Sequence, residues 1–396
     1  MLKVVGVNVL VFLLLILVVE LVMGLWFSNH YVSNCYTEKY HHEYCKGWVG
    51  FNSLAGEDGG GRIPIFVNQE GVRVESLAPT LSGVDVSRYN VINIGDSFMQ
   101  ADEVEFNETL SSNLNEVSGK RALQVGYSSW APIQMYNWIK SHDIQKGSIV
   151  NLFTMVNDYI PSYRGSNINY HKEANEGKDG LFYFSKYQGN TSEPKEVILT
   201  WREQSFFIGK YDQWKKNKKR SLSTQKKFST YKTLTGTQFD KLSKNCGHLE
   251  SWVDVPPLTY DYLSFSFVSK CWSPEQIEAV ENTLVDINKI YKSLMARGVE
   301  LNVFVIPPGW SFQSENLEGK ASAAYKIAPD TTLTIAGLTE YVTENTSANV
   351  FDLELVISGF KKETEKKMYF NYDGHWTKDM HEKLAAWMAT NVLFSP

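Results

Sequence analysis

Short apolar runs alternate with segments of helical spacing through most of the chain after residue 88. The runs are rich in β-branched residues, as in Val91-Ile92-Asn93-Ile94, which is typical of buried strands. Strands are expected at residues 89–94, 121–125, 148–154, 300–306 and 349–353. Helices are expected at residues 106–117, 132–141, 273–297, 338–343 and 377–392. Because strands that alternate with helices form parallel sheets with crossover helices, the pattern predicts an α/β fold.

Polar residues stand at the carboxyl ends of three of these expected strands. Asp96 and Ser97 follow the first strand, Gly126 ends the second, and Asn157 follows the third. In open parallel sheets, ligands bind at the carboxyl ends of the strands. The sequence therefore predicts that these residues share one site.

The amino-terminal segment has a different pattern. Residues 4–27 form an apolar run broken only by Asn8 and Glu20. At 1.5 Å per residue, a helix of this length crosses a hydrocarbon core of about 30 Å. A cleaved signal peptide is the alternative, but its apolar region usually spans about 7–15 residues. We therefore expect a single-pass membrane anchor, with residues 28–396 outside the cytoplasm, either in the periplasm or outside the cell.

This anchor divides the remaining chain into expected regions. Residues 1–3 are expected to form a cytoplasmic tip, and residues 28–87, rich in glycine and asparagine, a stalk and lead-in with little regular structure. Residues 88–396 form the α/β domain. Within it, residues 160–272 break the alternation and are expected to form an inserted, loop-rich subdomain.

The four cysteines fit a location outside the cytoplasm. Their spacing suggests disulfides between Cys35 and Cys45 and between Cys246 and Cys271, although four cysteines allow three connectivities. No CxxC pair is present, so we expect no metal and no other cofactor. The net charge of −5 gives no support for nucleic-acid binding.

Ser97 and His375 are the candidate reacting residues. A serine two residues after a glycine at a strand end, as in Gly95-Asp96-Ser97, can expose its hydroxyl on a tight turn, and it needs an adjacent base to become nucleophilic. His375, just before the last expected helix, is the candidate base, and Asp373 is the candidate acid that orients it. The alternative is that Asp96 and Ser97 only cap a helix and that His375 lies at the surface.

Together these residues resemble the SGNH (GDSL-type) esterase and acyltransferase superfamily, over about residues 88–158 and 273–392. The resemblance implies a flavodoxin-like three-layer fold. It also implies that Ser97 is the nucleophile, that Asp373 and His375 complete the triad, and that Gly126 and Asn157 join the Ser97 amide in the oxyanion hole. The Asp373-x-His375-Trp376 form also resembles that of membrane-associated members that O-acetylate polysaccharides, in which the Asp-x-His precedes the serine, whereas here it follows.

Three positions depart from the usual pattern of that superfamily. Phe98 stands where leucine is commoner, and Met155 stands where a glycine usually precedes the asparagine by two residues. The last block is Asp373-x-His375, whereas a spacing with two intervening residues is more frequent.

The expected function is that of a serine esterase that removes acyl groups, in the first instance acetyl, from an extracytoplasmic carbohydrate. The alternatives are an O-acetyltransferase of an exported polysaccharide and an inactive, anchored glycan-binding or assembly protein. Tyr127, Trp130 and Trp376 flank the expected site and are either sugar-stacking residues or core aromatics. Besides the membrane, a further candidate partner is a membrane protein that exports polysaccharide or supplies the acyl donor.

Overall fold

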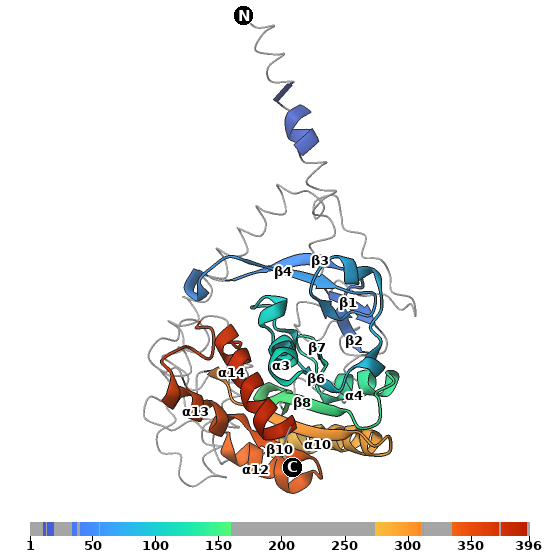
Figure 1. The fold of residues 1–396 in the computed structure, drawn as a ribbon, viewed down its shortest axis with the longest axis vertical. Coiled ribbons are helices and arrows are strands. Elements are labelled where there is room, and N and C mark those ends of the chain that lie inside the picture. Colours follow the sequence, from blue (N-terminus) through green and yellow to red (C-terminus); the bar gives the residue numbers. More distant parts are fainter. Residues whose placement is uncertain are drawn as a thin grey trace, which may run out of the picture.

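A sheet of five parallel strands forms the centre of the structure (Figure 1). The computed structural model describes residues 11–12, 14–19, 34–37, 40–54, 56–159, 274–309, 312, 335–371 and 374–393. The strands are β6 (Val91–Gly95), β7 (Ala122–Gly126), β8 (Ile149–Met155), β9 (Glu300–Ile306) and β10 (Asn349–Asp352). Their order is β10-β9-β8-β6-β7, which is the order of flavodoxin-like sheets. The predicted α/β fold with a parallel sheet is confirmed.

Helices cover both faces of this sheet. One face carries α4 (Pro132–Ser141), α10 (Pro274–Met295) and α12 (Ala336–Asn345), and its core includes Trp138 and Ile287. The other face carries α3 (Leu110–Ser118), α13 (Leu353–Glu363) and α14 (Lys378–Met388), and its core includes Leu114 and Leu384. Helix α13 has no counterpart in the sequence prediction. Because both faces are covered, the strands are apolar on both sides, and every residue of β6 is buried.

A row of asparagines crosses the sheet and fixes its register. Asn93, Asn151, Asn302 and Asn349 lie at matching positions on β6, β8, β9 and β10. The amide of Asn151 donates to Asn93 over 2.8 Å, and that of Asn302 donates to Asn151 over 3.0 Å. The amide of Asn349 donates to Asn302 over 3.1 Å. Slipping any one strand by one residue would leave buried amides unpaired, which is costly.

The amino-terminal region is more ordered than its sequence suggests. Residues 34–74 contain β1 (Asn34–Thr37), β2 (His41–Tyr44), β3 (Val49–Ser53), β4 (Arg62–Val67) and β5 (Arg73–Val74). Strands β1 and β2 form a hairpin, and β3, β4 and β5 form an antiparallel sheet. Tyr44, Trp48 and Ile65 are buried in the same core cluster as α4 and α10. The expectation of a stalk with little regular structure is therefore wrong for these residues.

Short helical turns complete the described elements. These are η2 (Gly56–Asp58), η3 (Ala78–Leu81), η4 (Val86–Arg88), α2 (Ser97–Gln100), η5 (Phe106–Glu108), η6 (Val156–Tyr159) and η9 (Ala389–Leu393). All are 3₁₀ helices except α2, which is one α-helical turn, and η9, which is a π-helical extension of α14.

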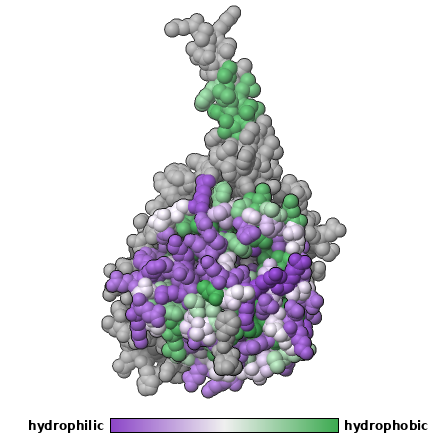
Figure 2. Space-filling view, in the orientation of Figure 1, coloured by the Kyte–Doolittle hydropathy of each residue, from purple (hydrophilic) through white to green (hydrophobic). Residues whose placement is uncertain are grey.

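Several of the sequence-based expectations concern residues that the structure does not describe, near the amino terminus and in the insertion at residues 160–272. Residues 11–12 and 14–19 are helical with exposed apolar side chains, which Figure 2 shows in green. No helix within the described residues is long and apolar enough to cross a membrane. Residues 160–272, with Cys246 and Cys271, lie outside the described residues. Cys45 is disulfide-bonded, but the Cys35 side chain is outside the described set, so their pairing stays a prediction.

Candidate active site

The strand order brings the three sequence clusters together. Strand β6 lies between β7 and β8, and the three strands are parallel, so their carboxyl ends are neighbours. Ser97 begins the single turn α2 directly after β6, and Gly126 ends β7 opposite Gly95. The turn η6, which contains Asn157, follows β8. The predicted convergence of these backbone segments at one sheet edge is confirmed.

A tight turn presents Ser97. The Asp96 carboxylate accepts a hydrogen bond from the Phe98 amide over 3.0 Å and caps the start of α2. The helix ends after four residues at Ala101, whose φ of 51° lies in the left-handed region. A residue with a Cβ pays a free-energy cost of about 1 kcal/mol or more there. Such strain is concentrated at functional sites and is held by the surrounding structure.

His375 is carried by a loop that folds back on itself before α14. The Phe370 amide donates to the His375 carbonyl over 2.8 Å, and Tyr369 and Trp376 form a β-bridge across the loop. The turn passes through Gly374, whose φ of 86° suits glycine. The imidazole ring lies against the Phe98 ring, with the ring centroids 4.9 Å apart.

This arrangement places the candidate base beside the candidate nucleophile. His375 Nε2 lies 2.8 Å from Ser97 Oγ, a hydrogen-bond distance. The two residues are 278 positions apart in the chain, so the approach is created by the fold. This distance agrees with the expectation that the Ser97 and His375 side chains lie next to each other.

The other nitrogen of the imidazole faces a residue that sequence analysis did not select. Glu103 Oε1 lies 3.4 Å from His375 Nδ1, and the Glu103 side chain is only 10% exposed. Glu103 belongs to the loop after α2, within an acidic stretch whose members look alike in sequence. Asp373, the expected acid, lies outside the described residues.

The structure describes only part of the candidate oxyanion hole. A Cβ placed on Gly126 would lie 2.5 Å from Met99 Cβ and 2.7 Å from the Asp96 carbonyl oxygen. Glycine at this position therefore lets the end of β7 approach the turn that carries Ser97. The side chain of Asn157 lies outside the described set.

Two buried carboxyl groups, those of Asp96 and Asp158, belong to the turns that follow β6 and β8. Asp96 and Asp158 are almost completely buried, and the Met155 amide donates to Asp158 over 2.9 Å. Burial, together with the nearby Asp96 carboxylate, raises the pKa of Asp158 well above its ordinary value. Asp158 is therefore protonated in conditions under which an exposed aspartate is charged.

A second histidine, His381 of α14, lies near His375. Burial lowers the pKa of His381 to about 3, with the positive charge of Arg73, and that of His375 when it is protonated, acting in the same direction. His381 is consequently neutral at physiological pH and adds no charge beside the candidate base.

The three aromatic residues that flank the site are core residues. Tyr127, Trp130 and Trp376 are between 1% and 3% exposed. The Trp130 indole donates to the His42 carbonyl over 2.7 Å, and the Trp376 ring packs against Phe98 at 5.1 Å. With so little exposed ring surface they cannot stack on a sugar in this conformation, so of the two alternatives the burial favours core aromatics.

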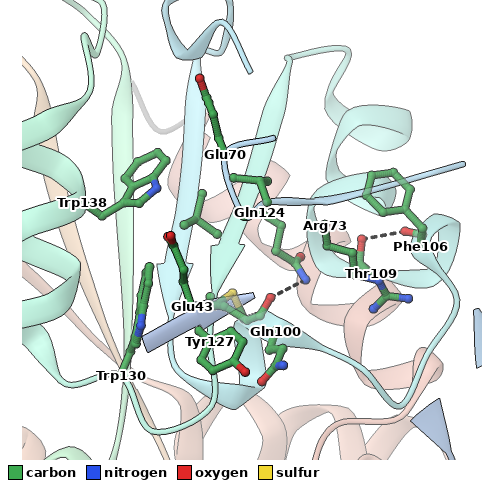
Figure 3. Close-up of a pocket in the computed structure, with 15 residues that line it drawn as sticks. Glu43, Glu70, Arg73, Gln100, Phe106, Thr109, Gln124, Tyr127, Trp130 and Trp138 are labelled. Atoms are coloured by element: carbon green, nitrogen blue, oxygen red, sulfur yellow. Dashed lines mark hydrogen bonds between the residues drawn. The ribbon is translucent and has the colours of Figure 1, made fainter. Parts of the chain in front are cut away.

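A small cavity lies behind Gly126, between the amino-terminal strands and the end of β7 (Figure 3). Its polar lining comes from Glu43, Glu70, Arg73, Gln100 and Gln124. Its volume of about 20 Å³ accommodates roughly one water molecule. Neither Ser97 nor His375 lines it, so it is separate from the reacting groups.

Metal ligation and similarity to known proteins complete the description of the site. Within the described ranges, no group of three or more His, Cys, Asp or Glu side chains is placed to hold a metal ion. No protein-family model matches this chain, and no curated protein sequence matches it significantly. The resemblance to SGNH enzymes therefore rests on the residues named above.

Proposed function

We propose that this chain is a serine ester hydrolase that works through an acyl-Ser97 intermediate. The observation that carries the proposal is the 2.8 Å approach of His375 Nε2 to Ser97 Oγ at the carboxyl edge of a parallel sheet. A serine hydroxyl is a weak nucleophile, and an adjacent imidazole that accepts its proton activates it.

The proposed reaction has two halves. Ser97 Oγ attacks the ester carbonyl carbon while its proton passes to His375 Nε2. The imidazolium then returns that proton to the leaving alkoxide as the ester C–O bond breaks. Water repeats the sequence on the acyl-serine, giving the carboxylic acid and free Ser97. Backbone amides at Ser97 and Gly126, with the amide of Asn157, are the proposed donors to the oxyanion.

The proposed substrate is an acyl ester, in the first instance acetyl, of an extracytoplasmic carbohydrate. The apolar run at residues 4–27 supports it, because an enzyme that acts on a polymer at its export site benefits from being held there. The burial of Tyr127, Trp130 and Trp376 removes the aromatic support for this substrate.

Labelling of Ser97 by a fluorophosphonate probe tests the proposal directly. We expect the wild-type chain to react, and Ser97→Ala and His375→Ala each to lose at least about 10³-fold in ester hydrolysis. Ser87→Ala, at a partly exposed serine that bonds only to Asp85 in the described structure, is the matched control. Circular dichroism checks the fold of each variant. A wild-type chain that does not react, or an active Ser97→Ala, rules the proposal out.

Hydrolysis and acyl transfer use the same residues, so products must distinguish them. The purified chain, incubated with an acetyl donor with and without an oligosaccharide, should release acetate at the same rate in both. Acetylated oligosaccharide would identify an acetyltransferase instead. Activity limited to long-chain lipid esters would exclude the carbohydrate substrate.

The proposed location is a single-pass anchor with residues 28–396 outside the cytoplasm. The full chain should fractionate with membranes and be digested by protease added from outside the cytoplasm. Recovery of the full chain in the soluble fraction would contradict this location.

A further inference from the structure

His375 has one ring nitrogen engaged with Ser97 and the other facing Glu103. For His375 Nε2 to accept the Ser97 proton, the neutral imidazole must carry its hydrogen on Nδ1. An acceptor at Nδ1 selects this tautomer and stabilises the imidazolium that forms. Glu103 Oε1, at 3.4 Å, is a carboxylate oxygen at this position.

We propose that Glu103 is the positioning residue that orients His375, and that the amino-terminal strands hold Glu103 in place through Arg73. The inference rests on the proposed function and names the acid of its triad. The proton still passes between Ser97 and His375, and Glu103 stays ionised throughout. It stabilises the positive charge that appears on the imidazole when Ser97 is deprotonated.

Arg73 on β5 holds the loop on both sides of Glu103. Its Nη1 donates to the carbonyl oxygen of Ala101, and its Nη2 donates to that of Val104 over 2.7 Å. The Arg73 side chain is buried, so these bonds are shielded from water. The planar guanidinium can span two carbonyls at once, which the single ammonium of lysine cannot do in the same geometry.

The residue between Ala101 and Glu103 is fixed as well. The Asn52 amide on β3 donates to the Asp102 carbonyl over 3.0 Å. The Tyr44 hydroxyl on β2 donates to the Asp102 carboxylate, and Gln100 donates to the same carboxylate over 3.0 Å. Burial and the nearby Asp102 charge raise the pKa of Tyr44, so its hydroxyl stays protonated and remains a donor.

Residues 101, 102 and 104 are thus each bonded to the amino-terminal strands, and Glu103 lies between them. This gives the strands at residues 41–74 a role in catalysis that a stalk would not have. The strained φ at Ala101 fits this account, because the Arg73 bond to its carbonyl stabilises that conformation.

The charges near His375 can be assigned to particular elements. Glu103 faces it from the loop after α2. His381 on α14 lies near it but is neutral at physiological pH. Because a nearby negative charge favours the imidazolium, removing the Glu103 charge should make His375 easier to deprotonate. The rising limb of the pH profile of kcat/KM should then shift towards lower pH.

Glu103→Gln is the central test, with Glu105→Gln as its matched control. Glu105 lies two residues away in the same loop and is exposed. We expect Glu103→Gln to lower kcat by about 10²- to 10⁴-fold with KM nearly unchanged, and to shift the pH profile as stated. Glu103→Asp should recover part of the loss, and Glu105→Gln should stay within twofold of wild type.

Two further variants test the connection to Arg73. Arg73→Lys should lower kcat at least tenfold, and the double variant with Glu103→Gln should be no worse than Glu103→Gln alone, since both act on one interaction. If Arg73→Lys does not fold, Asn52→Ala gives the same comparison at a partly exposed side chain. Additive losses in the double variant would overturn the role of the amino-terminal strands.

The acid assignment fails if Glu103→Gln stays within threefold of wild type, or if Asp373→Asn loses more activity than Glu103→Gln. Either result is distinct from failure of the proposed function. That failure would appear as a wild-type chain whose Ser97 does not react with fluorophosphonate.

Discussion

Gly126 lies directly against Met99. A Cβ at residue 126 would stand 2.5 Å from Met99 Cβ and 2.6 Å from the Met99 carbonyl carbon. The second of these atoms belongs to the backbone and cannot rotate away. Gly126→Ala must therefore displace either the end of β7 or the turn that carries Ser97.

We expect Gly126→Ala to lower ester hydrolysis at least 10²-fold and to destabilise the fold by about 1–3 kcal/mol, the usual cost of overpacking. Hydrolysis assays and urea denaturation measure the two effects. Gly337→Ala is the control, because a Cβ in α12 at that position meets nothing within 4 Å and favours the helix. Unchanged activity in Gly126→Ala would contradict the tight approach.

Phe98 supports His375 through ring contact. Its ring lies 4.9 Å from the His375 ring and 5.1 Å from the Trp376 ring. Phe98→Leu keeps most of the buried volume and should cost less than about 1.5 kcal/mol, with kcat within tenfold of wild type. Phe98→Ala leaves a cavity and should cost about 3–5 kcal/mol with a larger loss in kcat. Equal kcat values for the two variants would show that the bulk of the side chain at residue 98 does not position His375.

The asparagine row makes a prediction about stability alone. Asn151 is fully buried and bonds to both Asn93 and Asn302. Asn151→Leu should destabilise the fold by about 2–4 kcal/mol, since it leaves two buried amide groups without their partners. Asn349→Ala, at the exposed end of the row, should cost less than about 1 kcal/mol. Urea denaturation of the two variants decides whether the cost depends on burial.

The central sheet could be predicted because its strands follow a long, regular pattern. The strand expected at residues 300–306 is β9 (Glu300–Ile306), and the other four strands differ from expectation by one or two residues at one or both ends. The amino-terminal strands were missed because they are short, and because a glycine-rich turn separates β3 from β4. In β4 the last residues alternate inward, with Ile65 and Val67 buried, but this pattern covers only three positions.

The candidate site was predictable only in part. Ser97 stands at a strand end, where a parallel sheet gathers functional residues, and His375 was selected as the candidate base just before the last expected helix. Glu103 has no such signal, because Glu105 and Asp102 beside it are also acidic. The 3.4 Å approach of Glu103 Oε1 to His375 Nδ1, which depends on tertiary structure, distinguishes Glu103 from its neighbours, and the bonds from Arg73 hold its loop.

The buried carboxyl of Asp158 makes the stability of this fold depend on pH. Its pKa is raised in the folded chain, chiefly by burial, whereas in the unfolded chain it returns to about 3.8. Between these two values the folded chain holds a proton that the unfolded chain has released. The contribution of Asp158 to stability is therefore fully present below pH 3.8 and is lost as pH rises through the raised pKa.

Asp158→Asn should remove this dependence. The asparagine oxygen can still accept the hydrogen bond from the Met155 amide, and it never has to ionise in a buried place. The difference in unfolding free energy between variant and wild type should therefore move in favour of the variant as pH rises from 4 to 8. His381 acts in the opposite direction, because its pKa of about 3 is lowered from 6.5, but it is present in both chains and cancels in the difference. Urea denaturation at several pH values measures this difference, and a constant difference from pH 4 to pH 8 would show that Asp158 does not titrate as proposed.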